Sequence, residues 1–167
     1  MLAALKRMVA LAAEIAEGVL FANASLSHLA KSLAVVPPTQ RGDPDFLIGN
    51  MLPVCITDDE DAGLALHRRR LVGYVLLPNY RNYWKEAGYV EEMTAIEAAL
   101  GESRTEDIPK YLPDRWLADC TLLGPPAKIR DGVEAWRAAG IKTPVLVPLS
   151  ADGSQNTAIR QVFGAFE

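Results

Sequence analysis

Residues that could ligate a metal or act as nucleophiles are few in this sequence. His28 and His67 lie far apart and outside any HxxxH or HxxE pattern. Cys55 and Cys120 form no CxxC pair, and neither has a histidine beside it. Zinc and iron sites need several such ligands at short spacing, so we expect no metal site. No GxSxG elbow is present either, and the catalytic residues stay unknown at this stage.

Phosphate recognition has one candidate segment, the start of the first predicted helix. The chain contains neither GxxxxGK[ST] nor GxGxxG, so a P-loop and a Rossmann fingerprint are both absent. Residues 4–7 (ALKR) instead combine a helix start with two cations. Free backbone N–H groups and the helix dipole favour an anion at such a place. Solvated surface cations are the alternative interpretation of the same residues.

A second group of side chains could bind an anion by stacking and charge. Arg81, Tyr83, Trp84 and Lys85 lie within five consecutive positions. Aromatic rings and cations at this density can stack on an anionic ligand and pair with it. The alternative is an aromatic-rich corner between two helices, and the residues by themselves favour that alternative.

The other charged groups are expected to be structural or solvated. Arg68–Arg70 fits the solvated face of a helix, with His67 solvated beside it and His28 partly exposed. Over the whole chain, 17 basic and 21 acidic residues give a formal net charge of −4. This balance does not favour nucleic acid, because nucleic-acid binders usually carry a concentrated basic excess. Two cysteines are too few for a disulfide scaffold and fit a reducing compartment.

The elements that position these residues alternate along the chain. Short apolar segments predict strands at residues 19–22, 46–56 and 143–147, although Pro53 weakens the second. Amphipathic segments predict helices over these ranges: 5–16, 57–77, 89–100, 126–138 and 155–163, with another helix beginning at Ser25 or Ser27. Residues 115–119 are predicted as a short helix or a buried segment. Residues 37–45 and 123–126 are predicted as loops. Alternation of this kind favours a parallel sheet covered by helices.

The length of the chain and the charges near its N-terminus limit the fold and the location of the protein. The 167 residues suit one domain, 1–167, whereas a complete (β/α)8 barrel needs roughly 200 residues or more. Residues 1–20 are apolar, but Lys6, Arg7, Glu14 and Glu17 interrupt them. A membrane span needs about 18 uncharged residues, and a signal peptide needs a neutral cleavage region. We therefore expect a cytoplasmic protein without a membrane partner.

Two stretches of the chain together carry a family pattern. The first is LAALKRMVALAAEIAEG followed by VLFANAS, residues 2–25, and the second is DRWLADCTLLGPPAKIRDGVEAWRAAGIKTPVLVP, residues 114–148. They resemble the luciferase-like flavin monooxygenases and their deazaflavin-dependent oxidoreductase relatives. Ala-Glu-Gly at residues 16–18 stands where that family usually has Ala-Asp-Gly. The resemblance covers nearly all of this chain but only the C-terminal part of a family member.

The resemblance implies a fold and a cofactor. Family members are (β/α)8 barrels, so the chain would be an α/β protein forming an incomplete (β/α)8 barrel, with the three predicted strands as the sixth, seventh and eighth. The intact enzyme would transfer hydride with reduced FMN or a deazaflavin coenzyme to or from a small-molecule substrate, with or without oxygen. The alternative is a catalytically inactive remnant or assembly subunit. Such a subunit would need a second copy, or a separate N-terminal half-barrel, to complete the barrel.

The resemblance also implies candidate binding residues. Three match the turn that holds the cofactor phosphate: Ala4, Leu5 and Lys6. Three follow the first predicted strand and would line the substrate mouth of the barrel: Ala22, Asn23 and Ser25. Lys85 and Arg115 lie near positions where some deazaflavin-dependent relatives place cations for an anionic substrate. Arg115 is equally a candidate for a buried helix anchor paired with Asp114 or Asp119.

Overall fold

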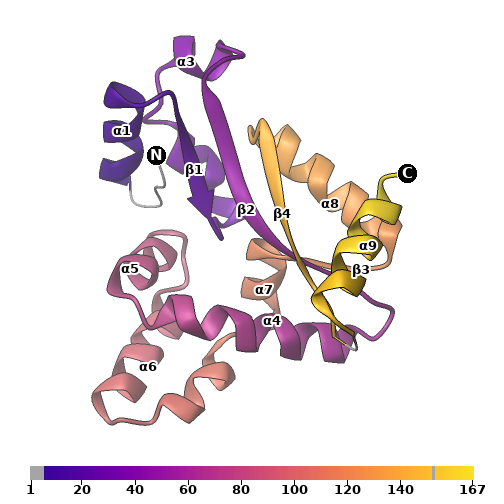
Figure 1. The fold of residues 1–167 in the computed structure, drawn as a ribbon. Coiled ribbons are helices and arrows are strands. Elements are labelled where there is room, and N and C mark those ends of the chain that lie inside the picture. The colour runs from indigo at the N-terminus through magenta and orange to yellow at the C-terminus, as the bar shows by residue number, and fades with distance from the viewer. Residues whose placement is uncertain (1–5, 152) are drawn as a thin grey trace.

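The computed structural model describes residues 6–151 and 153–167, in which four parallel strands form one sheet (Figure 1). The strands are β1 (Gly18–Ala22), β2 (Leu47–Ile56), β3 (Leu122–Gly124) and β4 (Thr143–Leu149). β2 is central, and β4 pairs along most of one edge of it. β1 and β3 share the other edge, β1 opposite the first half of β2 and β3 opposite its end. The predicted strands 19–22, 46–56 and 143–147 overlap β1, β2 and β4.

Helices precede, connect and follow the strands. They are α1 (Lys6–Ile15), η1 (Leu26–His28), α2 (Leu29–Leu33), α3 (Pro38–Gly42), α4 (Glu60–Val75), α5 (Pro78–Glu86), α6 (Val90–Gly101), η2 (Thr105–Tyr111), α7 (Asp114–Cys120), α8 (Pro126–Ala138) and α9 (Gln155–Ala165). The segment from α4 to α7 forms a lobe at the carboxyl ends of the strands (Figure 1). This lobe therefore lies at the end where barrel enzymes keep their sites. None of the described helices combines the length and the apolar character that a membrane crossing requires.

The proline in the central strand has a structural reason. On the edge that β1 and β3 share, β1 ends opposite Met51 and β3 begins opposite Val54. Pro53 lies in the gap between them, so no strand on that edge needs the N–H group that proline lacks. β2 can therefore continue through Pro53 at full length.

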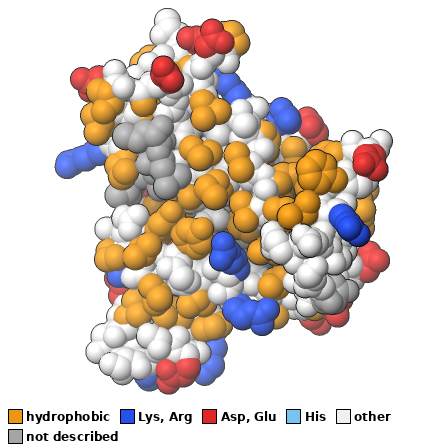
Figure 2. Space-filling view, in the orientation of Figure 1, with side chains coloured by type: hydrophobic (Ala, Val, Ile, Leu, Met, Phe, Trp, Pro, Cys, Tyr) orange, Lys and Arg blue, Asp and Glu red, His pale blue; other side chains and the backbone are white. Residues whose placement is uncertain are grey.

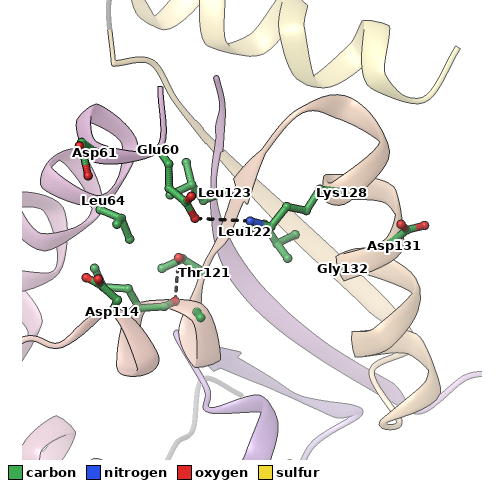
Figure 3. A pocket seen from close by; sticks show the side chains of 12 residues that line it. Glu60, Asp61, Leu64, Asp114, Thr121, Leu122, Leu123, Lys128, Asp131 and Gly132 are labelled. Atoms are coloured by element: carbon green, nitrogen blue, oxygen red, sulfur yellow. Dashed lines mark hydrogen bonds and ion pairs between the residues drawn. The ribbon is translucent and has the colours of Figure 1, made fainter. Parts of the chain in front are cut away.

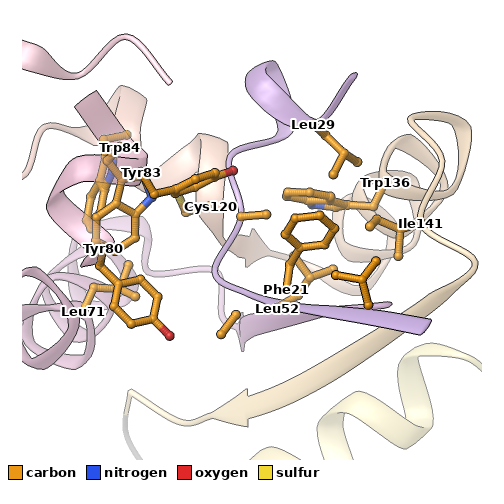
Figure 4. Packing of buried hydrophobic residues seen from close by; sticks show 14 of the residues in the cluster. Phe21, Leu29, Leu52, Leu71, Tyr80, Tyr83, Trp84, Cys120, Trp136 and Ile141 are labelled. Carbon is orange, nitrogen blue, oxygen red and sulfur yellow. The ribbon is translucent and has the colours of Figure 1, made fainter. Parts of the chain in front are cut away.

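One face of the sheet carries the hydrophobic core. Phe21 of β1 and Leu52 of β2 lie beside Leu29 of α2 and Trp136 of α8 (Figure 4). All four side chains have relative exposures of 1% or less. Burying side chains of this size stabilises the fold by about 1.5–3 kcal/mol each. The core thus fixes α2 and α8 against this face of the sheet.

The opposite face of the sheet is apolar but only partly covered. Because side chains alternate along a strand, the register places Leu47, Met51 and Val145 together on this face. Leu47 is 41% exposed and Val145 is 37% exposed. Figure 2 shows hydrophobic side chains across the middle of the molecule, between the regions of α1 and α9. A closed barrel would enclose this face.

Two loop predictions are corrected by the structure. Residues 37–45 include α3, because Pro38 occupies the first helical turn, where its fixed φ and missing N–H are favourable. Residues 123–126 were predicted as a loop, but Leu123 and Gly124 complete β3, which pairs with the last residues of β2. Gly124 has φ +130°, a conformation that few other residues adopt, and so ends the strand before α8.

Candidate functional site

The turn after β1 brings three of the predicted substrate residues together at the carboxyl end of the sheet. Ala22, Asn23 and Ser25 are all buried. Asn23 has a left-handed backbone (φ 56°), which asparagine tolerates better than most residues. Its N–H donates to the carbonyl of Met51, and the Ala24 N–H donates to Oδ1 of Asn50 at 3.3 Å. The neighbouring strand β2 therefore holds this turn in place.

Ser25 is fixed by the helical lobe. Its backbone N–H donates to Oη of Tyr83 at 2.8 Å, and its hydroxyl lies 3.6 Å from Sγ of Cys120. Burial raises the pKa of the Tyr83 hydroxyl, and burial also raises the pKa of the Cys120 thiol. Both groups therefore stay protonated at neutral pH, which excludes Cys120 as a thiolate nucleophile in this state. Tyr83 and Cys120 act here as contacts that position the turn.

Two amide groups at this turn have unused donors. Nδ2 of Asn23 and Nδ2 of Asn50 are buried and have no hydrogen-bond partner in the described part of the chain. Buried donors without partners are costly and are usually satisfied by water or a ligand. A water molecule or a ligand oxygen would satisfy these two donors.

Cations gather beside the start of α1. Two hollows, of about 270 and 540 Å³, share Lys6 and Glu86 in their linings. Their other charged or titratable lining residues are Arg7, His28, Lys31 and Lys85. Burial, with the nearby charge of Lys31, lowers the pKa of His28, so its ring is neutral at neutral pH. The donor set suits a phosphate or carboxylate group. Ala4 and Leu5 lie outside the described residues.

Lys85 is partly engaged by the protein. Its Nζ lies 2.5 Å from Oε2 of Glu97, and this hydrogen bond is the main reason that the pKa of Glu97 is lowered. Arg81 also reaches Glu97, at 3.3 Å, and donates to the carbonyl of Val75 at 2.7 Å. Lys85 thus lines a hollow, whereas Arg81 is a buried structural group.

The aromatic segment forms a corner between helices, the second of its two interpretations. Tyr83 and Trp84 are buried, and the ring of Trp84 meets Trp116 of α7 edge to face, with 4.7 Å between centroids. Figure 4 shows Tyr80, Tyr83 and Trp84 projecting together from α5. These rings join α5 to α7 and leave no face free for a ligand.

Arg115 lies on the outside of the lobe. Its guanidinium is 4.7 Å from the centre of the Tyr89 ring and pairs with Glu92. It pairs with neither Asp114 nor Asp119, so the predicted buried anchor is wrong. Asp114 pairs instead with Arg68, and Asp119 accepts from both the N–H and the hydroxyl of Ser27. A substrate role for Arg115 stays a prediction.

His67 is buried rather than solvated, which corrects the prediction. It is fully buried, and its Nε2 lies 3.3 Å from the carbonyl oxygen of Leu122 in β3. Burial lowers its pKa from 6.5 to about 4. His67 is buried because its side of α4 packs against β3, a strand that was not predicted from the sequence. Among the described residues, no three His, Cys, Asp or Glu side chains gather as metal ligands.

The comparison with family models identifies the chain. The model of the luciferase-like monooxygenases matches residues 1–143. The chain belongs to this family. No curated protein sequence matches it.

A solved structure shows how much of a barrel this luciferase-like chain represents. It is similar to the coenzyme F420 dependent tetrahydromethanopterin reductase from Methanopyrus kandleri, with a TM-score of 0.73 and 19% identity. The match covers 100% of this chain and 50% of that chain. The chain is therefore an α/β protein with the fold of an incomplete (β/α)8 barrel and spans about half the length of that reductase. The predicted family and fold class are confirmed.

The luciferase-like chain has a larger hollow that the sequence did not indicate. This open hollow, of about 680 Å³, lies between the starts of α4 and α8, the strand β3 and the helix α7 (Figure 3). Its acidic side chains are Glu60, Asp61, Asp114 and Asp131, and its apolar ones include Leu64 and Leu117. Lys128 pairs with Glu60 at 3.7 Å. Gly132 also lines the hollow, and a Cβ added there would collide with Leu122.

Proposed function

We propose that residues 1–167 form one partial barrel domain of an oxidoreductase that binds a flavin-type coenzyme. The observation that carries this proposal is the gathering of cations around the start of α1. Lys6, Arg7, Lys31 and Lys85 line two adjoining hollows beside the helix start that the family uses for the cofactor phosphate. Family membership supports the same class of chemistry.

Every predicted binding residue except Arg115 has a role in this proposal. Lys6, with Ala4 and Leu5, would hold the phosphate of FMN or of a deazaflavin coenzyme. The bound coenzyme would supply hydride chemistry, and the protein would position it. Asn23 would offer its unpartnered amide to an oxygen of the small-molecule substrate, while Ala22 and Ser25 would shape the turn around it. Lys85 would have to contact the anion while it remains paired with Glu97.

Fluorescence titration of the purified chain with FMN, and separately with a deazaflavin coenzyme, tests this proposal. One coenzyme should bind saturably, and Lys6→Ala should weaken it about tenfold, because a charge-assisted hydrogen bond to phosphate is lost. Lys110→Ala is the matched control, since Lys110 is an exposed lysine of η2 paired with Asp107. Absence of binding for both coenzymes at high micromolar concentration would remove the proposal.

A second candidate function is that of an assembly subunit, favoured by the apolar surfaces at the two sides of the sheet. α1 exposes Met8, Leu11 and Ile15, and the α9 region exposes Ile159, Phe163 and Phe166. Ile15 is 67% exposed and Phe163 is 71% exposed. These side chains and the open face of the sheet are exposed apolar surfaces that a partner would cover, since a closed barrel leaves no open sheet edge. The partner would be a complementary half-barrel or a second copy.

Thermal unfolding at several protein concentrations tests the assembly role. A chain stabilised by its own copies unfolds at a higher temperature when it is more concentrated. Phe163→Asp should abolish this dependence, whereas Thr94→Asp on the exposed side of α6 should leave it unchanged. A wild-type melting temperature that does not depend on concentration would refute self-association, and a complementary half would then be the remaining partner.

A further inference from the structure

The three consecutive arginines of α4 do not share one environment. Arg68 is held by the lobe: its Nε donates to the carbonyl of Leu112 at 3.0 Å, and its guanidinium pairs with Asp114. Arg69 and Arg70 are exposed, and no described carboxylate pairs with either of them. Two adjacent guanidinium groups therefore remain without a counter-charge among residues 6–151 and 153–167.

These two arginines line a hollow with the end of the sheet. A space of about 370 Å³ is bounded by Leu66, Arg69, Arg70, Gly73 and Leu149. Leu149 is the last residue of β4, so the hollow lies at the carboxyl end of that strand. Figure 2 shows Lys and Arg side chains at the lower border of the apolar face, over the region of α4.

The register places the hollow on the inner side of the sheet. Leu149 is paired with Cys55, and side-chain alternation puts both on the same face as Met51 and Val145. That is the face opposite the core, which lines the interior when a (β/α)8 barrel closes. The carboxyl end of the interior is the mouth at which barrel enzymes bind their substrates. Arg69 and Arg70 therefore lie at the mouth and not on the outer helical layer.

The chemistry of the hollow suits an oxyanion. Arginine presents a planar fork of N–H donors that matches the two oxygens of a carboxylate or phosphate group. Leu66 and Leu149 supply apolar wall beside it, and a Cβ added at Gly73 would meet no atom within 4 Å, so the space is open. Nucleic acid is a poor match, because the chain carries a net charge of −4.

We propose that Arg69 and Arg70 form a subsite for the carboxylate or phosphate group of a small-molecule substrate entering the barrel mouth. The place of this subsite rests on the proposed function, since it needs the sheet to be part of a barrel enzyme. The subsite is separate from the cations at the start of α1, because the two hollows share no lining residue.

Arginine side-chain NMR tests the subsite without coenzyme or activity. Inorganic phosphate and acetate are titrated separately while the Nε–H signals of the arginines are followed. The signals of Arg69 and Arg70 should shift saturably with at least one of the two anions, whereas Arg160 of α9 should not. A phosphate-selective response assigns the subsite to a phosphate ester, and an acetate response assigns it to a carboxylate. Equal, unsaturated shifts at all arginines would overturn the proposal.

Two matched glycine variants provide a second test of the subsite. Gly73→Glu adds a carboxylate at the lining of the hollow, where a Cβ meets no atom within 4 Å, and should weaken anion binding at Arg69 and Arg70 about tenfold or more. Gly164→Glu makes the same charge change on α9, where an added Cβ also meets nothing, and should leave that binding unchanged. Equal effects of both variants would mean general charge repulsion and would overturn the subsite. The anion titration contains no coenzyme, so its failure would refute the subsite. A failed coenzyme titration would instead refute the proposed coenzyme binding.

Discussion

The buried histidine of α4 predicts a specific loss of stability in mild acid. His67 has a pKa of about 4 in the folded chain, against 6.5 for an ordinary histidine, because burial disfavours its charged form. Between these two values the unfolded chain binds a proton that the folded chain does not. The free energy of unfolding should therefore fall as the pH is lowered from 6.5 to 4. The full loss is about 3 kcal/mol, at about 1.4 kcal/mol for each unit of pKa difference.

Urea unfolding of the wild type and of His67→Gln at pH 7 and pH 4.5 measures this loss. Glutamine keeps an amide that can donate to the carbonyl of Leu122 but cannot take up a proton. The wild type should lose about 2–3 kcal/mol more than the variant between the two pH values. The carboxylates titrate in both proteins, so the difference isolates His67. Parallel pH profiles of the two proteins would refute the assignment of a buried neutral imidazole.

Two further predictions concern the turn after β1 and its contacts. Asn23→Ala should destabilise the chain by about 1 kcal/mol more than Asn23→Gly in urea unfolding, because glycine adopts φ 56° readily and alanine does not. Equal losses of stability would show that the asparagine side chain, and not the backbone conformation, determines the effect. Cys120 and Cys55 are both buried, and burial raises the pKa of the Cys120 thiol. An aromatic disulfide reagent at pH 8 should therefore label neither until urea unfolds the chain, and prompt labelling of the native protein would contradict the buried geometry.

The sequence predicted the outline of the fold because its strongest signals are local. The apolar segments that became β1, β2 and β4 are long enough to stand out, and the chain length excluded a complete barrel. β3 was missed because it has three residues and is defined only by its pairing with the end of β2. Such a strand has no sequence pattern of its own.

The site was predictable to a smaller extent, since exposure depends on partners distant in sequence. His67 and Arg69 lie two positions apart on one helix, yet β3 buries the first, and the second faces a hollow. Ser25 was placed correctly at the carboxyl end of β1, but its burial depends on Tyr83 and Cys120. Arg115 pairs with Glu92 of another helix rather than with Asp114 or Asp119.

If the sheet is an open part of a barrel, its inner face and edge helices should be covered by a partner. Sedimentation equilibrium of the purified chain over a wide range of concentrations tests it most directly. We expect a mass well above the 18.2 kDa of one chain that decreases on dilution, or a mass that rises above 18.2 kDa when a complementary half-barrel is added. A folded species of 18.2 kDa at every concentration, indifferent to any added half-barrel, would contradict it.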